Sequence, residues 1–276
     1  MVETIEEAAP DRGPDAAPTK TWGDWVRFVL RGVGQILISA GVIVLLFVVY
    51  EVYITNYFAH EAQSKVKNEL RTEIAQGNDP LGDGRLRLPG SKAPSVPDGT
   101  GIAFLYMPRL GADYAWAIVQ GTNDADLEKG PGHYVGTALP GQVGNFAVAG
   151  HRVGKGEPFL NLDHLQAGDT VIVQTESKWF VYRVKGMQHN NIDSTDSDGI
   201  PGREIVSPSD GDVLDAVPDH PSDSTPTERL MTMTTCHPKF TAAQRMVIHA
   251  VLWKTYSASG LTMPAPVKAL YNTQGS

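Results

Sequence analysis

The residues from Gly32 to Tyr50 form a run of 19 without a charged side chain. At about 1.5 Å per residue, a helix of this length spans about 28 Å, close to the ~30 Å hydrocarbon core of a bilayer. A buried core helix and a secretory signal peptide are the alternatives. The apolar part of a signal peptide is usually only about 7–15 residues long, and no clean A-x-A cleavage site follows this run. The run therefore predicts a transmembrane helix over residues 32–50.

Charges on the two sides of this run predict its orientation. Arg27 and Arg31 precede it and Glu51 follows it, and the positive-inside rule places the basic side in the cytoplasm. Residues 1–31 are then a cytoplasmic tail, and residues 1–20, rich in Ala, Pro and acids, are typical of a disordered segment. We therefore expect a single-pass cell-membrane protein whose remaining residues lie outside the cell.

The rest of the chain divides by composition. Residues 51–76 lack Gly and Pro and mix charges at helical spacing, which predicts a membrane-proximal helical stalk. Residues 77–99 are rich in Gly and Pro, which predicts a linker. Short runs of Val, Ile, Thr and aromatic residues over 100–258 predict an all-β domain, either a closed barrel or a sandwich, followed by a C-terminal tail over 259–276. The expected strands are 102–107, 116–119, 145–150, 170–174, 180–185, 230–236 and 246–253.

Composition excludes several function classes. The chain has 23 basic and 31 acidic residues, a net charge of −8, which argues against a general nucleic-acid partner. Residues 190–229 hold ten acids and two arginines, so this one stretch accounts for the whole excess. It is too long for a passive connection, and we expect a loop with a short helix of its own. A single cysteine excludes an intramolecular disulfide, a Cys-rich zinc site and an iron–sulfur cluster.

That cysteine, Cys236, is the first candidate for chemistry. It ends the run that starts at Leu230, and Pro238 stops the strand, so Cys236 is expected near a rim of the sheet. A lone cysteine is most often a small buried apolar residue. Outside the membrane, however, a free thiol is a liability that is kept where it is used. Cys236 is therefore a candidate nucleophile.

A cysteine nucleophile needs an acid–base partner and a site for the developing negative charge. Arg245 opens the next strand, so a hairpin would bring it near Cys236, where it could stabilise that charge. The alternative interpretation of Arg245 is an ordinary solvent-facing strand residue. His151 ends the strand 145–150 and is the candidate acid–base residue, with a surface turn histidine as the alternative. His237 cannot easily turn back to its neighbour. His133 and His249 remain possible structural residues, although alternation puts His249 on the face of Arg245.

Two segments also carry a resemblance to a known family. Gly130-Pro-Gly-His-Tyr134, continuing to Ala149-Gly-His-Arg152, resembles the histidine motif of sortases. Thr234-Thr-Cys236-His-Pro238, followed by Arg245, resembles their TLTTC…R motif, with Met233 where the family usually has Leu. The resemblance covers about residues 102–253, and the motif forms look most like class E sortases of actinobacteria.

The resemblance implies an eight-stranded β-barrel with short helices and a cysteine transpeptidase activity that needs no cofactor and no metal. Such enzymes cut a C-terminal LPXTG-type sorting signal between Thr and Gly, class E members being associated with LAXTG, and pass the protein to an amine of the cell wall. The expected partners are sorting-signal-bearing surface proteins and a peptidoglycan precursor amine. The resemblance assigns Cys236 as nucleophile, His151 as general acid/base and Arg245 as the oxyanion-stabilising and substrate-orienting residue. The same motifs suggest substrate-binding roles for Tyr134, Asn145, Ala149 and Thr235.

Two further segments loosely match known motifs. In the acidic segment 193–199, an EF-hand alignment puts Ser194 and Ile205 at the two liganding ends, so the segment is expected to be a solvated loop beside the substrate groove. Asp79-Pro80-Leu81 loosely resembles the lid of pilus-building class C sortases but lacks the aromatic residue. A pilin-polymerising enzyme is therefore the alternative to housekeeping anchoring.

Other protein classes fit less well. The L,D-transpeptidases resemble an S/T-HGC-hN pattern, which Thr235-Cys236-His237-Pro238 does not match. Papain-like proteases place Cys before His, the reverse of the order here. A non-enzymatic membrane-tethered β-domain, such as an adhesin, would not need a cysteine, a histidine and an arginine together.

Overall fold

The chain forms two units, residues 1–49 and 50–276, which are described separately. The computed structural model describes residues 22–50, 55–81, 96–222, 224–258 and 260–274.

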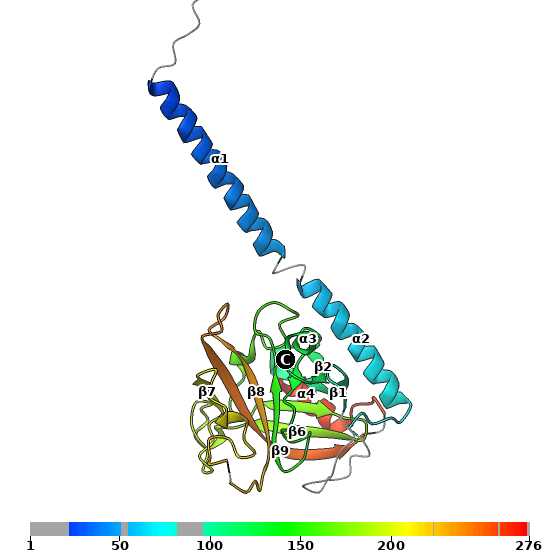
Figure 1. The fold of residues 1–276 in the computed structure, drawn as a ribbon. Helices are drawn as coiled ribbons and strands as arrows, with labels where there is room; N and C mark the ends of the chain where they lie inside the picture. Colours follow the sequence, from blue (N-terminus) through cyan, green and yellow to red (C-terminus); the bar gives the residue numbers. More distant parts are fainter. Residues whose placement is uncertain (1–21, 51–54, 82–95, 223, 259, 275–276) are drawn as a thin grey trace, which may run out of the picture. The chain divides into compact units, whose positions relative to one another are not determined.

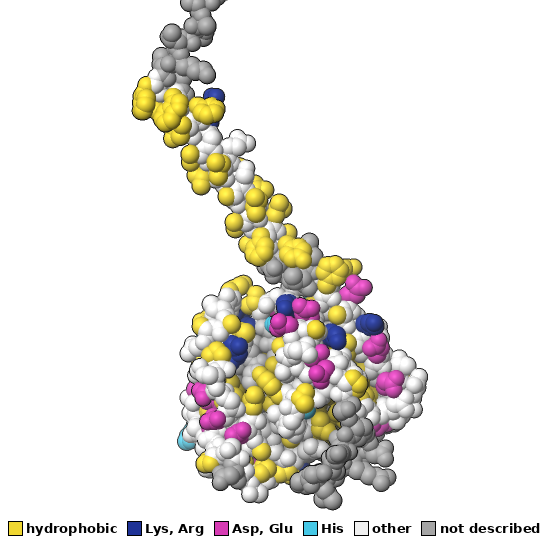
Figure 2. Space-filling view, viewed as in Figure 1, with side chains coloured by type: hydrophobic (Ala, Val, Ile, Leu, Met, Phe, Trp, Pro, Cys, Tyr) yellow, Lys and Arg dark blue, Asp and Glu magenta, His cyan; other side chains and the backbone are white. Residues whose placement is uncertain are grey.

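The first unit contains one long helix, α1 (Trp22–Val49). Its Trp25–Val49 segment is long and apolar enough to cross a membrane, and none of that apolar segment is buried against protein. Figure 2 shows hydrophobic side chains over the outside of this helix. The predicted apolar helix is present, but it begins before Gly32, so Arg27 and Arg31 lie within the helix instead of preceding it. Its length and composition are compatible with a membrane anchor.

The second unit, whose strands wrap around one another in Figure 1, is built on a nine-stranded sheet. The strand order is β6-β5-β1-β2-β3-β4-β8-β9-β7. A further pairing between β6 and β9 closes the sheet into a barrel. Since β3 is only two residues long, eight longer strands make up the barrel, as predicted. The strands are β1 (Gly101–Tyr106), β2 (Ala115–Gln120), β3 (Gly132–His133), β4 (Gly144–Ala149), β5 (Thr170–Gln174), β6 (Lys178–Val184), β7 (Arg203–Val206), β8 (Arg229–His237) and β9 (Gln244–Ser257).

Strand β9 closes the barrel because it is long enough to pair with three others. Its first half pairs with β8 on one edge and with β7 on the other, and its second half pairs with β6. Alternation along the strands separates two faces. Phe146 and Val148 of β4, Met231 and Met233 of β8, and Ile248 of β9 pack into the barrel core. The residues between them therefore project from the outer face of the barrel.

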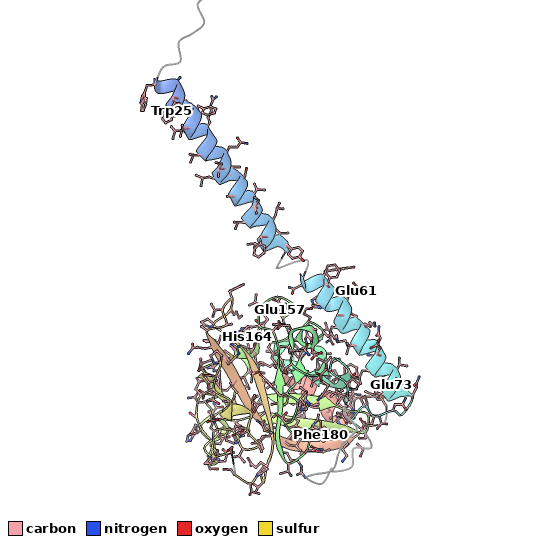
Figure 3. The ribbon with its side chains drawn as sticks, viewed as in Figure 1. Trp25, Glu61, Glu73, Glu157, His164 and Phe180 are labelled. Atoms are coloured by element: carbon pink, nitrogen blue, oxygen red, sulfur yellow. The ribbon has the colours of Figure 1, made fainter. Side chains whose placement is uncertain are left out.

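Helix α2 (Thr55–Ala75) lies where a helical stalk was predicted, and it is packed against the barrel. Three apolar residues at four-residue spacing, Val66, Leu70 and Ile74, are buried against β1 and β2. Gln63 also satisfies the backbone of Ala117 on β2, with its Oε1 accepting from the amide at 2.7 Å and its Nε2 donating to the carbonyl at 3.2 Å. The helix is thus a part of the folded unit. Its exposed face carries charged side chains such as Glu61 and Glu73, labelled in Figure 3.

Five further helical segments among the described residues are short: η2 (Pro108–Leu110), α3 (Asp124–Leu127), η3 (Leu162–His164), η4 (Met187–His189) and η5 (Asp212–Leu214). The acidic stretch 190–229, expected to be a loop with a helix, contains strand β7 and a single 3-10 turn, η5 (Asp212–Leu214).

The C-terminal segment predicted as a tail forms helix α4 (Ala265–Gln274). Its Val267 is fully buried against Ile172 and Trp179, so burial of an apolar face holds this helix on the barrel. Most of the predicted linker 77–99, namely residues 82–95, lies outside the described residues, so the hypothesis that the linker forms a lid stays a prediction. Leu81 and Val96, on either side of it, pack into the barrel core.

Candidate active site

The β8–β9 hairpin brings Cys236 and Arg245 together. In the antiparallel register the two residues are direct partners, and side chains of such partners leave the same face with Cβ atoms about 4.5–5.5 Å apart. Cys236 is a free, half-buried thiol near the end of β8. It alternates with Met231 and Met233, which face the core, so its thiol projects from the outer face of the barrel.

Strand β4 brings His151 to the same end of the sheet. It runs parallel to β8 with Ala149 level with Thr234, and the Gly150 amide still donates to the Thr234 carbonyl at 3.0 Å. If this register is extended by two residues, His151 is level with Cys236. A side chain at position 150 would put its Cβ 2.5 Å from the Phe159 ring, so only glycine fits between the strand and the histidine.

The surroundings of His151 favour a neutral imidazole. The ring is half-buried, and Nε2 is buried without a hydrogen-bond partner among the described residues. Burial lowers the pKa of His151, and the nearby Lys155 lowers it further, against the opposing fields of Asp124 and Glu128. Lys155 is itself paired with Glu128 at 3.1 Å. The unpartnered Nε2 can therefore take up a proton and return it.

Arg152 is a buried cation that links the segment after β4 to the end of β8, and its role was not predicted. Its side chain is only 4% exposed. Nη1 donates to the His237 Nδ1 at 3.1 Å and to the Cys236 carbonyl at 3.4 Å, and Nη2 pairs with Asp163 at 3.1 Å. Asp163 comes from the β4–β5 loop, on which Figure 3 labels Glu157 and His164. Because Arg152 directly follows His151, these contacts connect the histidine segment to the end of β8.

Arg245 itself is held by the turn that joins β8 and β9. Its Nη1 donates to the carbonyl oxygens of Ala242 and Gln244, both at 3.1 Å. These are partly exposed hydrogen bonds to neighbouring residues, so they can be exchanged for others at low cost. Arg245 is thus the direct cross-strand partner of Cys236, and its guanidinium can bind an anion or a carbonyl oxygen.

Three of the four predicted substrate-binding residues lie beside this site. Tyr134 joins its hydroxyl to that of Thr234 at 2.9 Å. Thr235 donates to the Gly150 carbonyl at 2.7 Å, which ties the cysteine strand to the histidine strand. Ala149 is largely buried in the parallel pairing with β8.

Asn145, the fourth, lies near the opposite end of β4 and is 1% exposed. Its Oδ1 accepts from the Thr232 hydroxyl at 2.7 Å and its Nδ2 donates to the Val213 carbonyl at 3.2 Å. The structure thus uses Asn145 inside the protein and does not bring it to the three catalytic candidates.

The other candidate histidines are committed elsewhere. His133 is buried with both ring nitrogens hydrogen-bonded, and burial lowers its pKa to about 4. His237 faces Arg152. His249 is fully buried between Thr232 and Glu204, at 2.9 and 2.8 Å.

The acidic stretch contains internal ion pairs, whereas a solvated loop was expected. Lys185, which is almost fully buried, lies 2.5 Å from Asp198 and 3.7 Å from Asp196. Arg203 pairs with Asp193 at 2.7 Å. These pairs satisfy the carboxylates that suggested a calcium loop. A separate group that could hold a metal ion is formed by Glu204 on β7, Asp219 in the loop between β7 and β8, and His249 on β9.

Comparison with known proteins agrees with this geometry. Residues 105–253, more than half of the chain, match the sortase domain. The chain is 36% identical over 225 residues to sortase SrtE1 of Streptomyces coelicolor, covering 79% of this chain but only 55% of SrtE1. It is 30% identical over 237 residues to sortase SrtE2 of the same organism, covering 84% of this chain and 85% of SrtE2.

Solved structures show the same likeness. The SrtF sortase from Corynebacterium diphtheriae matches with a TM-score of 0.58 and 39% identity, over 66% of this chain and 98% of that one. Sortase E1 from Streptomyces coelicolor, solved with a tripeptide in the active site, matches with a TM-score of 0.50 and 32% identity, over 61% and 98% of the two chains. The chain therefore belongs to the sortase family of cysteine transpeptidases and most resembles its class E members.

Proposed function

We propose that this protein cuts a C-terminal sorting signal of LAXTG or LPXTG type between Thr and Gly and joins the released protein to an amine of the cell wall. One observation carries the proposal. Cys236 and Arg245 are direct partners on β8 and β9, and β4, which pairs with β8 as far as Ala149, ends two residues before His151. A nucleophile, a proton carrier and a fixed cation are the groups that acyl transfer through a thioester requires.

The first half of the reaction forms the acyl-enzyme. Cys236 first gives its thiol proton to the neutral His151, and the resulting thiolate attacks the threonine carbonyl carbon. A C–S bond forms, the π bond of the carbonyl opens and the oxygen becomes an oxyanion. Arg245 exchanges its turn carbonyls for this oxygen and stabilises its charge. The oxyanion then collapses, the C–N bond breaks, and His151 gives its proton to the leaving glycine amine.

The second half reverses these roles with a different amine. An acceptor amine of the peptidoglycan precursor attacks the thioester, and His151 takes the proton that the amine loses. The C–S bond breaks and Cys236 leaves as a thiolate, which is a good leaving group. The lowered pKa of His151 suits this step, because an unprotonated imidazole is the form that accepts a proton.

Helix α1 supports a membrane-anchored topology in this proposal. Its apolar segment ends at Val49, which directly precedes the second unit in the sequence, and the basic residues of the helix, Arg27 and Arg31, lie near its other end. The positive-inside rule then leaves the N-terminus in the cytoplasm and the catalytic unit outside. Surface proteins that carry sorting signals are delivered to that side.

Housekeeping anchoring is favoured over pilin polymerisation for two reasons. The Asp79-Pro80-Leu81 segment lacks the aromatic residue of the class C lid, and its Leu81 packs into the barrel core. The convergence of the three catalytic candidates likewise favours an enzyme over a non-enzymatic tethered domain.

Full-length protein in detergent micelles tests the proposal. It is incubated with LAXTG and LPXTG peptides and an amine acceptor, and the masses of protein and products are followed. We expect a thioacyl adduct on Cys236, a transpeptidation product that depends on the amine, and neither of these with Cys236→Ala. If no sorting peptide gives an adduct while the thiol still reacts with iodoacetamide, the proposed substrate class is wrong.

A further inference from the structure

Three side chains with ligand-type atoms converge outside the active site. Glu204 comes from β7, Asp219 from the loop between β7 and β8, and His249 from β9. Their oxygen and nitrogen atoms all lie within 4.8 Å of one another. His249 lies four residues along β9 from Arg245, roughly 13 Å at the usual rise of a strand. The cluster is therefore separate from the candidate active site.

A chain of buried hydrogen bonds determines which nitrogen of His249 carries a proton. The Asn145 amide nitrogen must donate to the Val213 carbonyl, so its oxygen faces Thr232. The Thr232 hydroxyl donates its single proton to that oxygen at 2.7 Å. It can therefore only accept from His249 Nδ1, at 2.9 Å. A neutral His249 then presents the lone pair of Nε2 to the cluster.

This lone pair meets only acceptors. His249 is 0% exposed, and its Nε2 lies 2.8 Å from Glu204 Oε1. Asp219 contacts the same glutamate. The basic residues next to β7 do not supply a counter-charge, because Lys185 pairs with Asp198 and Arg203 pairs with Asp193. A buried nitrogen lone pair facing carboxylate oxygens requires a proton or a cation between them.

The geometry and the outer partners fit a metal ion. Two ligand atoms 2.8 Å apart subtend close to a right angle at a metal about 2.0–2.1 Å from each. A histidine that binds a metal almost always donates its other N–H to a fixed partner, as His249 does to Thr232. Glu204 is half-buried and Asp219 reaches the surface, which leaves a path for the ion and for water ligands.

We propose that Glu204, Asp219 and His249 form a binding site for a divalent first-row metal ion of the Zn²⁺ class. One imidazole and two carboxylates suit such ions better than Ca²⁺, which prefers six or more oxygen ligands. Bound there, the ion fastens the loop between β7 and β8 to β7 and β9. The sequence contains no metal-ligand spacing for this site, because the three ligands come from separate elements. The proposal goes beyond the transpeptidase reaction and does not depend on it.

Calorimetric titration tests the site directly. Full-length protein with Cys236→Ala, which removes the active-site thiol as a competing ligand, is stripped with EDTA, freed of chelator and titrated with ZnCl₂ at pH 7.5. We expect one Zn²⁺ per chain, with slower hydrogen exchange in residues 207–222. No binding, or binding of Ca²⁺ in preference to Zn²⁺, would overturn the proposal.

Variants assign the ligands. Asp219→Asn, at the surface, should weaken Zn²⁺ binding at least tenfold, whereas Asp210→Asn, exposed in the same loop, should leave it unchanged. Thr232→Val keeps the side-chain shape but removes the hydroxyl that accepts the hydrogen bond from His249 Nδ1. The loss of such an outer partner typically lowers metal affinity about 10–100-fold. Equal affinities in Asp219→Asn and Asp210→Asn would overturn the assignment, even if the buried His249→Gln variant failed to fold.

Discussion

Replacement of Arg152 by methionine tests whether this buried arginine positions the cysteine strand. Methionine has a similar length and no donor, so the change removes the links to Asp163, to His237 and to the Cys236 carbonyl at once. These links join the segment after His151 to the end of β8. We expect the variant to lose both stability and turnover.

The contacts set the size of the effect. Hydrogen bonds to charged groups contribute about 1.5–3 kcal/mol each, and two of the three are short enough, at 3.1 Å, to count fully. Two terms offset part of this loss. Arg152 Nε is buried without a partner among the described residues, and Asp163 is 33% exposed and regains water. A net loss of about 2–3 kcal/mol follows, below the ~3–5 kcal/mol for breaking a fully buried pair.

Asp163→Asn provides the matched comparison. It leaves the charge of Arg152 buried without its counter-ion, whereas the double variant removes both charges. The double variant should therefore be less destabilised than the sum of the two single variants by at least about 1 kcal/mol. Urea unfolding of the four proteins measures this coupling. Strictly additive losses would refute the idea that the pair acts as one unit.

Turnover separates positioning from simple stability. With the sorting peptide as substrate, Arg152→Met should lower kcat about tenfold or more, equivalent to about 1.4 kcal/mol of transition-state stabilisation, with KM changed little, because the arginine side chain is buried against Asp163 and His237. Arg152→Lys should recover part of kcat by retaining the charge. Unchanged kcat in folded Arg152→Met would show that the contact with the Cys236 carbonyl does not position the thiol.

Two pH effects follow from buried histidines. Lys155→Gln should raise the pKa of His151, because Lys155 lowers it in the folded protein, and the corresponding limb of the pH–rate profile should move to higher pH; an unmoved limb would contradict the assigned role of His151. His133 has a folded pKa of about 4, against about 6.5 in an unfolded chain, so the unfolded state binds the proton first and stability is lost as the pH falls from about 6.5 to about 4. The loss should reach about 3 kcal/mol in urea unfolding, and a wild-type profile parallel to that of His133→Gln would contradict it.

The strands that could be predicted from the sequence are those with long apolar, β-branched runs. Strand β7 was missed because Arg203-Glu204-Ile205-Val206 mixes charge with apolar residues and remains partly exposed. Its existence depends on the first half of β9, an edge that only the closed barrel supplies. Strand β3 has only two residues, which is too short to show an alternation of apolar and polar side chains.

Helix α2 shows a different limit. Its helical character was predictable from the absence of Gly and Pro, but its docking was not. The buried residues Val66, Leu70 and Ile74 are separated by charged positions, which reads as an exposed helix. Docking also needs Gly101, where a Cβ would lie 2.9 Å from Val66. Such a fit is a property of two distant segments and has no signature in either one.

The candidate site divides in the same way. The reactive side chains stand at strand ends beside Gly150 and Pro238, so residue type and position mark them in the sequence. Their supports are pairs across the fold, such as Arg152 with Asp163 and Thr235 with Gly150. Asn145 belongs to the same motif as His151 and was therefore predicted to bind substrate, but it is buried inside the protein.

The outer face of β8 explains why one motif contains both reactive and structural residues. Met231 and Met233 face the core, so Thr232, Thr234 and Cys236 share the opposite face. Cys236 provides the thiol at the strand end, Thr234 contacts Tyr134, and Thr232 orients the imidazole of His249. A strand that must place polar groups on one face and methionines on the other tolerates few substitutions at any of these positions. The motif therefore encodes the support of the barrel's polar face as well as the nucleophile, and mutations at Thr232 should affect the proposed metal site while leaving the Cys236 thiol reactive.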